Sequence, residues 1–168
     1  PRSSIVRYKF PARGEMPPVT LTWWDGGLMP QRPDELEDDM PFGDPNGGCL
    51  FVGDKGKLVC GCYGLNPRIL NADLRAEAKK LGKTIPRIPG NSNGHEKDWI
   101  RACKGGVAAS SNFDYSGPLS EMVLMGNLAS RFPDRKLLWD GAKMKVTNDE
   151  GANAYVNRVY RKGFELGT

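Results

Sequence analysis

Apolar and polar residues alternate along two runs near the start of the chain. Residues 5–10 (IVRYKF) place Val6, Tyr8 and Phe10 on one face, and residues 19–23 (VTLTW) alternate apolar with hydroxyl side chains. A period of two residues is typical of a strand with one buried face. The two runs therefore predict an antiparallel pair, joined by the segment between them.

A β-hairpin is predicted over residues 49–60. Two apolar runs, CLFV and KLVC, flank the sequence Gly-Asp-Lys-Gly, and both Gly and Asp tolerate the positive φ angles of tight turns. Residues 136–139 (KLLW) form a shorter strand candidate. Residues 84–89 contain two prolines, which predicts an extended segment outside any central strand.

The centre of the chain, residues 94–132, predicts two helices joined by a polar loop. In the first, Trp99, Ile100 and Cys103 share one side, and a pair of glycines ends the helix. The second is predicted to open near Pro118, because the first helical position tolerates a missing N–H. Apolar residues cover almost its whole circumference, which predicts that this helix is deeply buried.

Two other helices are predicted from their N-caps. One covers residues 71–81 with Asn71 as its cap, and the last runs from Asn148 or Asp149 to about Tyr160. Because strands and helices are grouped separately, the order favours an α+β fold with a largely antiparallel open β-sheet and helices packed on one face. The length suits one core better than two, so residues 1–168 are predicted to form a single domain.

A long segment without a regular pattern covers residues 25–48. It contains several prolines and glycines and a group of acidic residues. Only Pro33 to Leu36 suggests a single helical turn. Connections of this length are usually functional flaps or plain surface loops, and the sequence leaves both alternatives open.

The composition excludes several classes of function. Net charge is +4 and the basic residues are dispersed among acidic ones, which does not favour nucleic-acid binding. No apolar run approaches the roughly 18 residues of a membrane span. The cysteines at positions 49, 60, 62 and 103 fit neither a disulfide framework nor a zinc ribbon, so no metal site is predicted and the compartment stays open.

Two places carry candidate binding chemistry. Trp24 and Asp25 follow a predicted strand, and an aromatic face beside a carboxylate can hold a sugar-like ring. The alternative is that the tryptophans at this strand end only pack on the sheet while Asp25 starts a turn. His95 is the only histidine, and it is either a substrate contact or a capping and packing residue at a helix start.

The chain begins at Pro1 and enters a strand-like run almost at once. This is expected of a domain cut from a longer chain, and also of a mature secreted protein after processing.

Five strings of the sequence together resemble the C-terminal half of the glucose–fructose oxidoreductase and inositol dehydrogenase family, in particular a bacterial branch with a W-x-D-G-G string. They are LTWWDGGLMPQRP (21–33), LFVGDKGKLVCGCYG (50–64), HEKDWIRACKGG (95–106), SSNFDYSGPLSEMVLMGNLASRF (110–132) and LLWDGAKMKVTNDEGANAYVNRVYRKGFEL (137–166). The resemblance covers nearly the whole chain. Its most specific parts are the G-D-K-G hairpin, the H-x-x-D-W-I helix and the G-P-L-x-E helix.

The resemblance implies a two-domain parent protein. In that family an N-terminal Rossmann domain binds NAD or NADP, and a C-terminal α+β domain covers the substrate with a sheet that often forms the subunit interface. The family's E-K-P string and D-x-x-x-H catalytic pair precede the matched region and are absent from this sequence. The resemblance therefore assigns no catalytic, cofactor-binding or metal residue here, and NAD or NADP is expected only for the full-length protein.

The resemblance leads to a first hypothesis about function. The chain is expected to be the substrate-binding and oligomerisation domain of an NAD(P)-dependent oxidoreductase acting on a sugar or polyol. Its expected partners are the missing Rossmann domain, further copies through the sheet and the small molecule. Trp24, Asp25 and His95 are expected to orient hydroxyl groups, and Arg32 in the long segment to meet an acidic group or a cofactor phosphate.

Two rival hypotheses remain. In the second hypothesis the parent protein is a glycoside-cleaving enzyme that uses NAD transiently, which is a recognised exception to the two-carboxylate scheme. In the third it is an assembly protein without catalytic activity.

Overall fold

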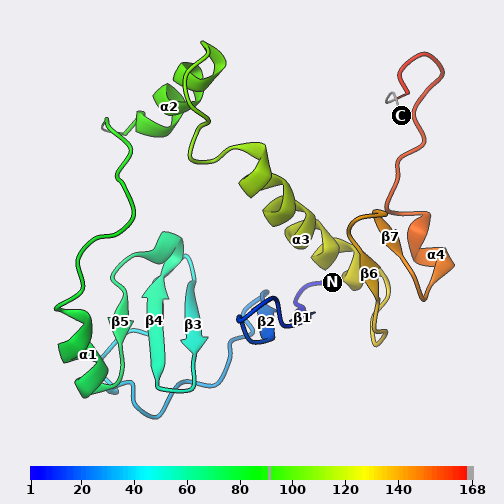
Figure 1. Ribbon diagram of the computed structural model, residues 1–168. Coiled ribbons are helices and arrows are strands. Elements are labelled where there is room, and N and C mark those ends of the chain that lie inside the picture. The colour runs from blue at the N-terminus through cyan, green and yellow to red at the C-terminus, as the bar shows by residue number, and fades with distance from the viewer. Residues whose placement is uncertain (91, 166–168) are drawn as a thin grey trace. The chain divides into compact units, whose positions relative to one another are not determined.

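The computed structural model describes residues 1–90 and 92–165 and confirms the α+β class (Figure 1). The chain divides into two compact units, which are considered separately below: unit 1 is Pro1–Met29 with Ile88–Thr168, and unit 2 is Pro30–Arg87. All strand pairs among the described residues are antiparallel, and they form three small open sheets. The elements are β1 (Ile5–Phe10), β2 (Val19–Trp24), β3 (Gly48–Val52), β4 (Lys57–Gly61), a 3₁₀ turn (Cys62–Gly64), β5 (Arg68–Ile69), α1 (Ala72–Ala78), α2 (Gly94–Cys103), α3 (Phe113–Arg131), β6 (Trp139–Asp140), β7 (Lys145–Val146) and α4 (Glu150–Asn153).

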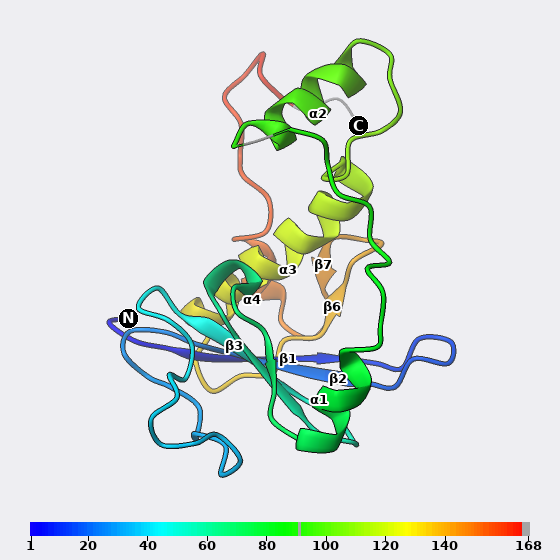
Figure 2. The same ribbon diagram turned by 90° about the vertical axis from the view of Figure 1, so that its left-hand side faces the viewer.

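In unit 1, β1 and β2 run side by side as a two-stranded ribbon, as predicted (Figure 2). The register pairs Ile5 with Trp24 and Phe10 with Val19. The ribbon contacts α3 where the hydroxyl of Tyr8 meets Gly126, since a Cβ atom at position 126 would lie 2.6 Å from that oxygen. This packing partly buries Tyr8 and raises the pKa of its hydroxyl. A larger residue at 126 would therefore have to displace the Tyr8 hydroxyl.

Helix α3 differs from its prediction in two ways. It begins at Phe113, because the side chain of Asn112 accepts hydrogen bonds from the backbone N–H groups of Asp114 and Tyr115, so Pro118 lies inside the helix. The expected deep burial is wrong: all residues of α3 are described, and Leu128 is the only buried one. Large apolar side chains on the first part of the helix are exposed, namely Phe113, Tyr115, Leu119, Val123 and Leu124.

The C-terminal end of α3 contributes to a core in unit 1. Leu128, Val146 and Ala152 are buried together, and partly buried apolar residues surround them. Asp149 caps α4 as predicted, with its carboxylate accepting from the N–H of Ala152. The helix ends at Asn153, well before the predicted Tyr160.

Unit 2 contains the predicted hairpin. β3 pairs with β4 from Gly48–Gly61 to Val52–Lys57, and β5 adds a short third strand. Leu36, Val59 and Leu70 form its core, with Phe42 and Leu50 against it. Leu36 thereby fastens the long segment to the sheet.

Helix α1 follows β5 and is shorter than predicted. It ends at Ala78, and Asn71 at its N-cap position makes no capping hydrogen bond with its side chain. The Asn71 side chain instead accepts from the backbone N–H of Lys57, 3.2 Å away. The residue therefore links α1 to strand β4.

Candidate functional site

Trp24 and Asp25 lie at the end of β2, where the strand is locked to the start of β1. The two carboxylate oxygens of Asp25 accept from Ser4, one from its backbone N–H at 2.6 Å and the other from its hydroxyl at 2.9 Å. The Asp25 carbonyl accepts from the N–H of Leu28, so Asp25 also starts a turn. Trp24 is half-buried, whereas the adjacent Trp23 is 59% exposed. At this strand end Trp24 is therefore half-buried, and the Asp25 carboxylate already accepts two hydrogen bonds from Ser4.

Arg32 closes the long segment on itself. One terminal nitrogen of its guanidinium donates to three backbone carbonyls: Leu36 at 3.4 Å, Met40 at 2.8 Å, and Glu37. The N–H of Leu36 also bonds the carbonyl of Pro33, which matches the single turn predicted there. The segment is consequently a folded loop, with Arg32 holding its carbonyls together.

A cleft of about 340 Å³ lies between this loop and the β5–α1 region of unit 2. That volume is at the low end for small-molecule sites, which span about 300–1,000 Å³. The loop side includes Leu36, Glu37 and Met40, the residues whose carbonyls Arg32 holds. The opposite side supplies apolar and basic groups: Ile69, Leu70, Arg68, Arg75 and Lys79.

Two of the basic side chains of the cleft already donate hydrogen bonds to backbone carbonyls. Arg75 donates from Nε to the carbonyl of Ile69 at 3.0 Å and from Nη2 to that of Leu70 at 3.2 Å. Arg68 donates to the carbonyl of Pro41, and its Nε is buried without a hydrogen-bond partner. The cleft is therefore lined by apolar, basic and acidic groups, since Glu35 and Glu37 also border it, and it is bounded by a loop that Arg32 shapes.

His95 lies in the first turn of α2, and its side chain is exposed. The N-cap position of this helix is Asn93, so His95 does not cap it. Trp99, Ile100 and Cys103, predicted on one side of α2, are also exposed. The helix ends as predicted, with Gly105 at a φ of +87°.

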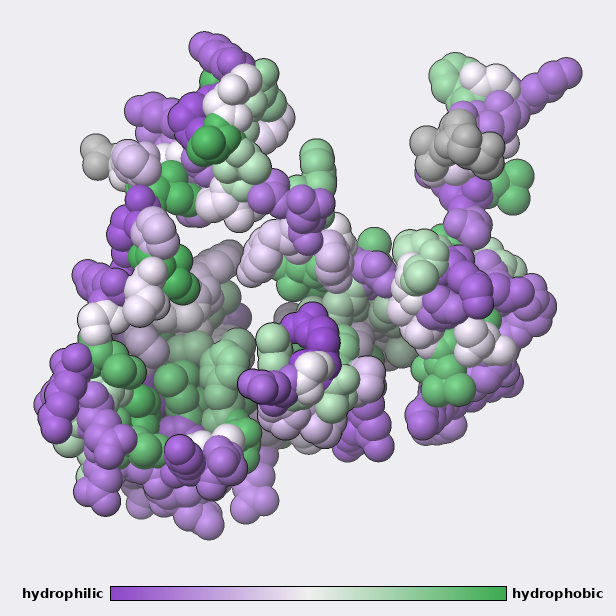
Figure 3. Space-filling view, viewed as in Figure 1, coloured by the Kyte–Doolittle hydropathy of each residue, from purple (hydrophilic) through white to green (hydrophobic). Residues whose placement is uncertain are grey.

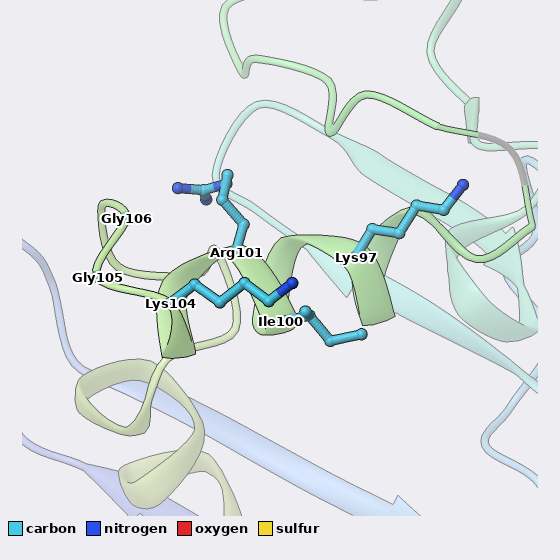
Figure 4. Close-up of a pocket in the computed structure, with 6 residues that line it drawn as sticks. All are labelled: Lys97, Ile100, Arg101, Lys104, Gly105 and Gly106. Atoms are coloured by element: carbon cyan, nitrogen blue, oxygen red, sulfur yellow. The ribbon is translucent and has the colours of Figure 1, made fainter.

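A second, more open depression follows the end of α2 (Figure 4). It is lined by Lys97, Ile100, Arg101, Lys104 and the two following glycines. Figure 4 shows the basic side chains extending in different directions, so they do not converge on one point. The N–H groups of both glycines are used by carbonyls at the helix end. This surface has no converging donors for an anion.

Sequence reasoning missed Asp98, which organises the loop after α2. Its carboxylate pairs with Arg101 and accepts from the N–H of Ser110 at 2.9 Å and from the Ser110 hydroxyl at 3.2 Å. Arg101 in turn donates to the carbonyl of Val107 at 3.0 Å. The Arg101 hydrogen bond, followed by the Ser110 N–H, holds the pKa of Asp98 below its ordinary value of 3.8.

Replacing Asp98 by Asn is expected to loosen the loop in a pH-dependent way. A lowered folded-state pKa means that the carboxylate stabilises the fold above its ordinary pKa, and that this contribution disappears as pH falls through the lowered value. Amide exchange at Ser110 is therefore faster in Asp98→Asn than in the parent chain at about pH 6, and the ratio approaches one toward about pH 2. Asp38→Asn, at an exposed position, is the control and is expected to leave exchange at Ser110 unchanged. If Ser110 exchanges at the same rate in Asp98→Asn and in the parent chain at both pH values, Asp98 does not hold the loop.

The structure brings together only some of the sequence-predicted site residues. Trp24 is the last residue of β2 and Asp25 follows it, His95 is on α2 of the same unit, and Arg32 belongs to unit 2. Within residues 1–90 and 92–165, no hydrogen bond or ion pair joins one of these four side chains to another, and no group of three or more His, Cys, Asp or Glu side chains is placed to hold a metal ion. None of the described helices is long and apolar enough to cross a membrane.

No protein-family model and no curated protein matches this chain.

Proposed function

We propose that this chain is the substrate-covering and oligomerising domain of an NAD(P)-dependent oxidoreductase that acts on a sugar or polyol. In this proposal a Rossmann domain of the parent protein supplies the cofactor and the catalytic residues, as in the glucose–fructose oxidoreductase and inositol dehydrogenase family that the sequence motifs resemble. The chain contributes binding surfaces, and none of its residues is assigned to hydride transfer.

The observation that carries the proposal is the unpartnered apolar surface of α3. The first part of this helix exposes five large apolar or aromatic side chains. Leu124, for example, is 62% exposed. Several large apolar side chains exposed on one helix are the kind of surface that contacts with another protein or domain usually cover. A domain that closes against a cofactor-binding partner has such a surface, whereas a self-sufficient small protein would bury it.

Two features support a small polar substrate. At the end of β2, Trp24 offers an aromatic edge for C–H groups, and Asp25 offers carboxylate lone pairs to hydroxyl groups. The cleft of unit 2 has the volume of a small-molecule site and is bounded by the loop that Arg32 holds. His95 is a third candidate substrate contact, because its side chain is exposed at the start of α2.

The three-stranded sheet of unit 2 supports self-association. Phe51 is 57% exposed on β3, and Figure 3 shows apolar residues, in green, reaching the surface in this part of the chain. We propose that copies of the parent protein associate through this sheet, since an apolar sheet face in water favours pairing with a second copy.

The rival hypotheses differ in what happens to the cofactor. A glycoside-cleaving parent releases an aryl glycoside's leaving group without net change of NAD, and an assembly protein without activity does neither reaction. No feature of the described residues favours either over the oxidoreductase.

The proposal is tested first by titrating this chain with NAD and with NADP in a calorimeter. The expected result is no heat of binding above dilution, because the nucleotide-binding residues belong to the absent domain. The parent protein carrying the chain is titrated in parallel as the positive control. Tight binding of either dinucleotide by the chain alone would contradict the proposal.

A further inference from the structure

Three of the four cysteines lie at one end of the β3–β4 hairpin. Cys49 on β3 is directly opposite Cys60 on β4, and Cys62 opens the turn that follows β4. All three thiols are free. Partial burial, then the neighbouring Cys60 and finally Cys62 raise the pKa of Cys49, which places the three sulfurs in one neighbourhood.

The Cys49–Cys60 pair lies on the face of the hairpin opposite the unit 2 core. The adjacent pair, Leu50 and Val59, packs into that core, and successive residues of a strand point to opposite faces. Cys49 is exposed, whereas Cys60 is only 6% exposed. One thiol of the pair is thus open to a solvent-borne reagent, and the other is shielded beside it.

The Cα separation expected for this pair is compatible with a disulfide. The N–H of Gly53 bonds the carbonyl of Gly56 at 2.9 Å, and hydrogen-bonded pairs alternate from there along the ladder, which makes Cys49–Cys60 a hydrogen-bonded pair. Such pairs have Cα atoms about 5.5 Å apart, inside the range of about 4.4–6.8 Å that disulfides span.

The competing pairs are less suitable. Cys60 and Cys62 are separated by one residue, so a bond between them closes a small ring that departs from ordinary disulfide geometry. The backbone N–H of Cys62 is held by the carboxylate of Asp44 at 2.7 Å, which fixes the turn beyond the strand. Only Cys49 and Cys60 are register partners.

We propose that Cys49 and Cys60 are an oxidative modification site that closes to an intrachain disulfide across β3 and β4 when the chain meets a peroxide. The Cys49 thiolate attacks one oxygen of hydrogen peroxide and the O–O bond breaks. Cys49 becomes a sulfenic acid, and the other oxygen leaves as hydroxide, which takes up the proton lost from the thiol and becomes water. The thiol of Cys60 then attacks the Cys49 sulfur, the S–S bond forms, and the sulfenic oxygen leaves as a second water. The two thiols are oxidised and the peroxide is reduced.

This inference uses neither the cofactor nor the substrate. Cys49 and Phe51 lie two residues apart on β3 and share a face, so association through that face would shield Cys49, and the inference applies to chains in which the face is open. Since the thiolate is the nucleophile and burial raises the pKa of Cys49, the reaction is expected to accelerate as pH rises above neutrality. A thiol reductant is expected to reverse it, because a bond at an exposed strand position is accessible to exchange.

The experiment treats the whole chain with hydrogen peroxide, blocks the remaining thiols under denaturing conditions, and maps tryptic peptides by mass spectrometry. Cleavage at Lys55 and Lys57 places Cys49 and Cys60 on separate peptides, so a disulfide joins them. The expected result is a reductant-sensitive linked pair in the parent chain and in Cys62→Ser. The linked pair is lost in Cys49→Ser and in Cys60→Ser.

Cys103 is exposed on α2 in the other unit and has no neighbouring cysteine on that helix. Its oxidation measures how far peroxide attacks a thiol merely because that thiol is exposed. The proposal is overturned if Cys103 is oxidised while Cys49 and Cys60 stay reduced. It is equally overturned if the link survives in Cys60→Ser and disappears in Cys62→Ser, or if Cys49 links only to a second copy on a non-reducing gel.

Discussion

Leu128→Ala is expected to lower the free energy of unfolding of unit 1 by about 2–5 kcal/mol, the usual cost of removing a buried leucine side chain and leaving a cavity. Leu128 is 7% exposed and packs with Val146 and Ala152, two residues that contribute the β7 and α4 sides of the same core. Urea denaturation followed by tryptophan fluorescence measures the loss, because Trp139 packs against this cluster.

Leu124→Ala is the matched control for that experiment. It removes the same atoms from the same helix one turn earlier, where the side chain is exposed. Surface truncations of this kind usually change stability by within about 0.5 kcal/mol. Equal losses for Leu124→Ala and Leu128→Ala would show that the first part of α3 is buried in the isolated chain, and would remove the observation on which the proposed function rests.

Trp24→Ala is expected to weaken binding of the sugar or polyol to the parent protein by roughly tenfold, because an aromatic contact contributes about 0.5–1.5 kcal/mol beyond its buried area and 1.4 kcal/mol corresponds to a factor of ten. The effect is expected in KM more than in kcat, since the residue is proposed to hold the substrate and takes no part in hydride transfer. Initial rates with a panel of hexoses and polyols measure both parameters.

Trp23→Ala tests whether the effect belongs to the substrate side of the strand. Trp23 is the neighbour of Trp24 on β2, and its side chain points to the other face. Its replacement is expected to leave KM unchanged. If both variants raise KM equally, or neither does, the strand end is not the substrate contact. Circular dichroism of both variants confirms that the ribbon is intact.

Local signals in the sequence predicted much of this fold. Period-two alternation located the β1–β2 ribbon to within one residue, and the Gly-Asp-Lys-Gly turn located the β3–β4 hairpin. The glycine after α2 was also predicted correctly, and Asp149, the cap of α4, was one of the two caps predicted there, because both features depend on backbone groups a few residues away.

Three incorrect predictions concern the cap of α1, the burial of α3 and the first residue of α3. Asn71 was predicted to cap α1, yet its side chain accepts from Lys57 on β4, a partner that no local pattern reveals. α3 was predicted to be buried because it is apolar nearly all round, but apolar composition reports what a helix can bury and not whether a partner is present. Asn112 starts the helix earlier than Pro118 because an N-cap outweighs a tolerated proline.

The assignment of Trp24, Asp25, Arg32 and His95 to a substrate site stays a prediction, and only their places in the fold can be compared with the sequence. The sequence indicated Trp24 and Asp25 as a strand-end pair, and they are. It did not indicate that Arg32 would hold the carbonyls of its own loop, nor that Asp98 would join Arg101 to Ser110. Both arrangements depend on loop conformations, which residue spacing alone does not determine.

The most direct test of the account is a spectrophotometric assay of hydride transfer by the parent protein that carries this chain, supplied with a hexose or polyol and NAD or NADP. The account predicts reduced dinucleotide accumulating with the parent protein and none with this chain alone. Dinucleotide reduction by the chain alone, or aryl glycoside cleavage by the parent protein with no net reduction, would contradict it.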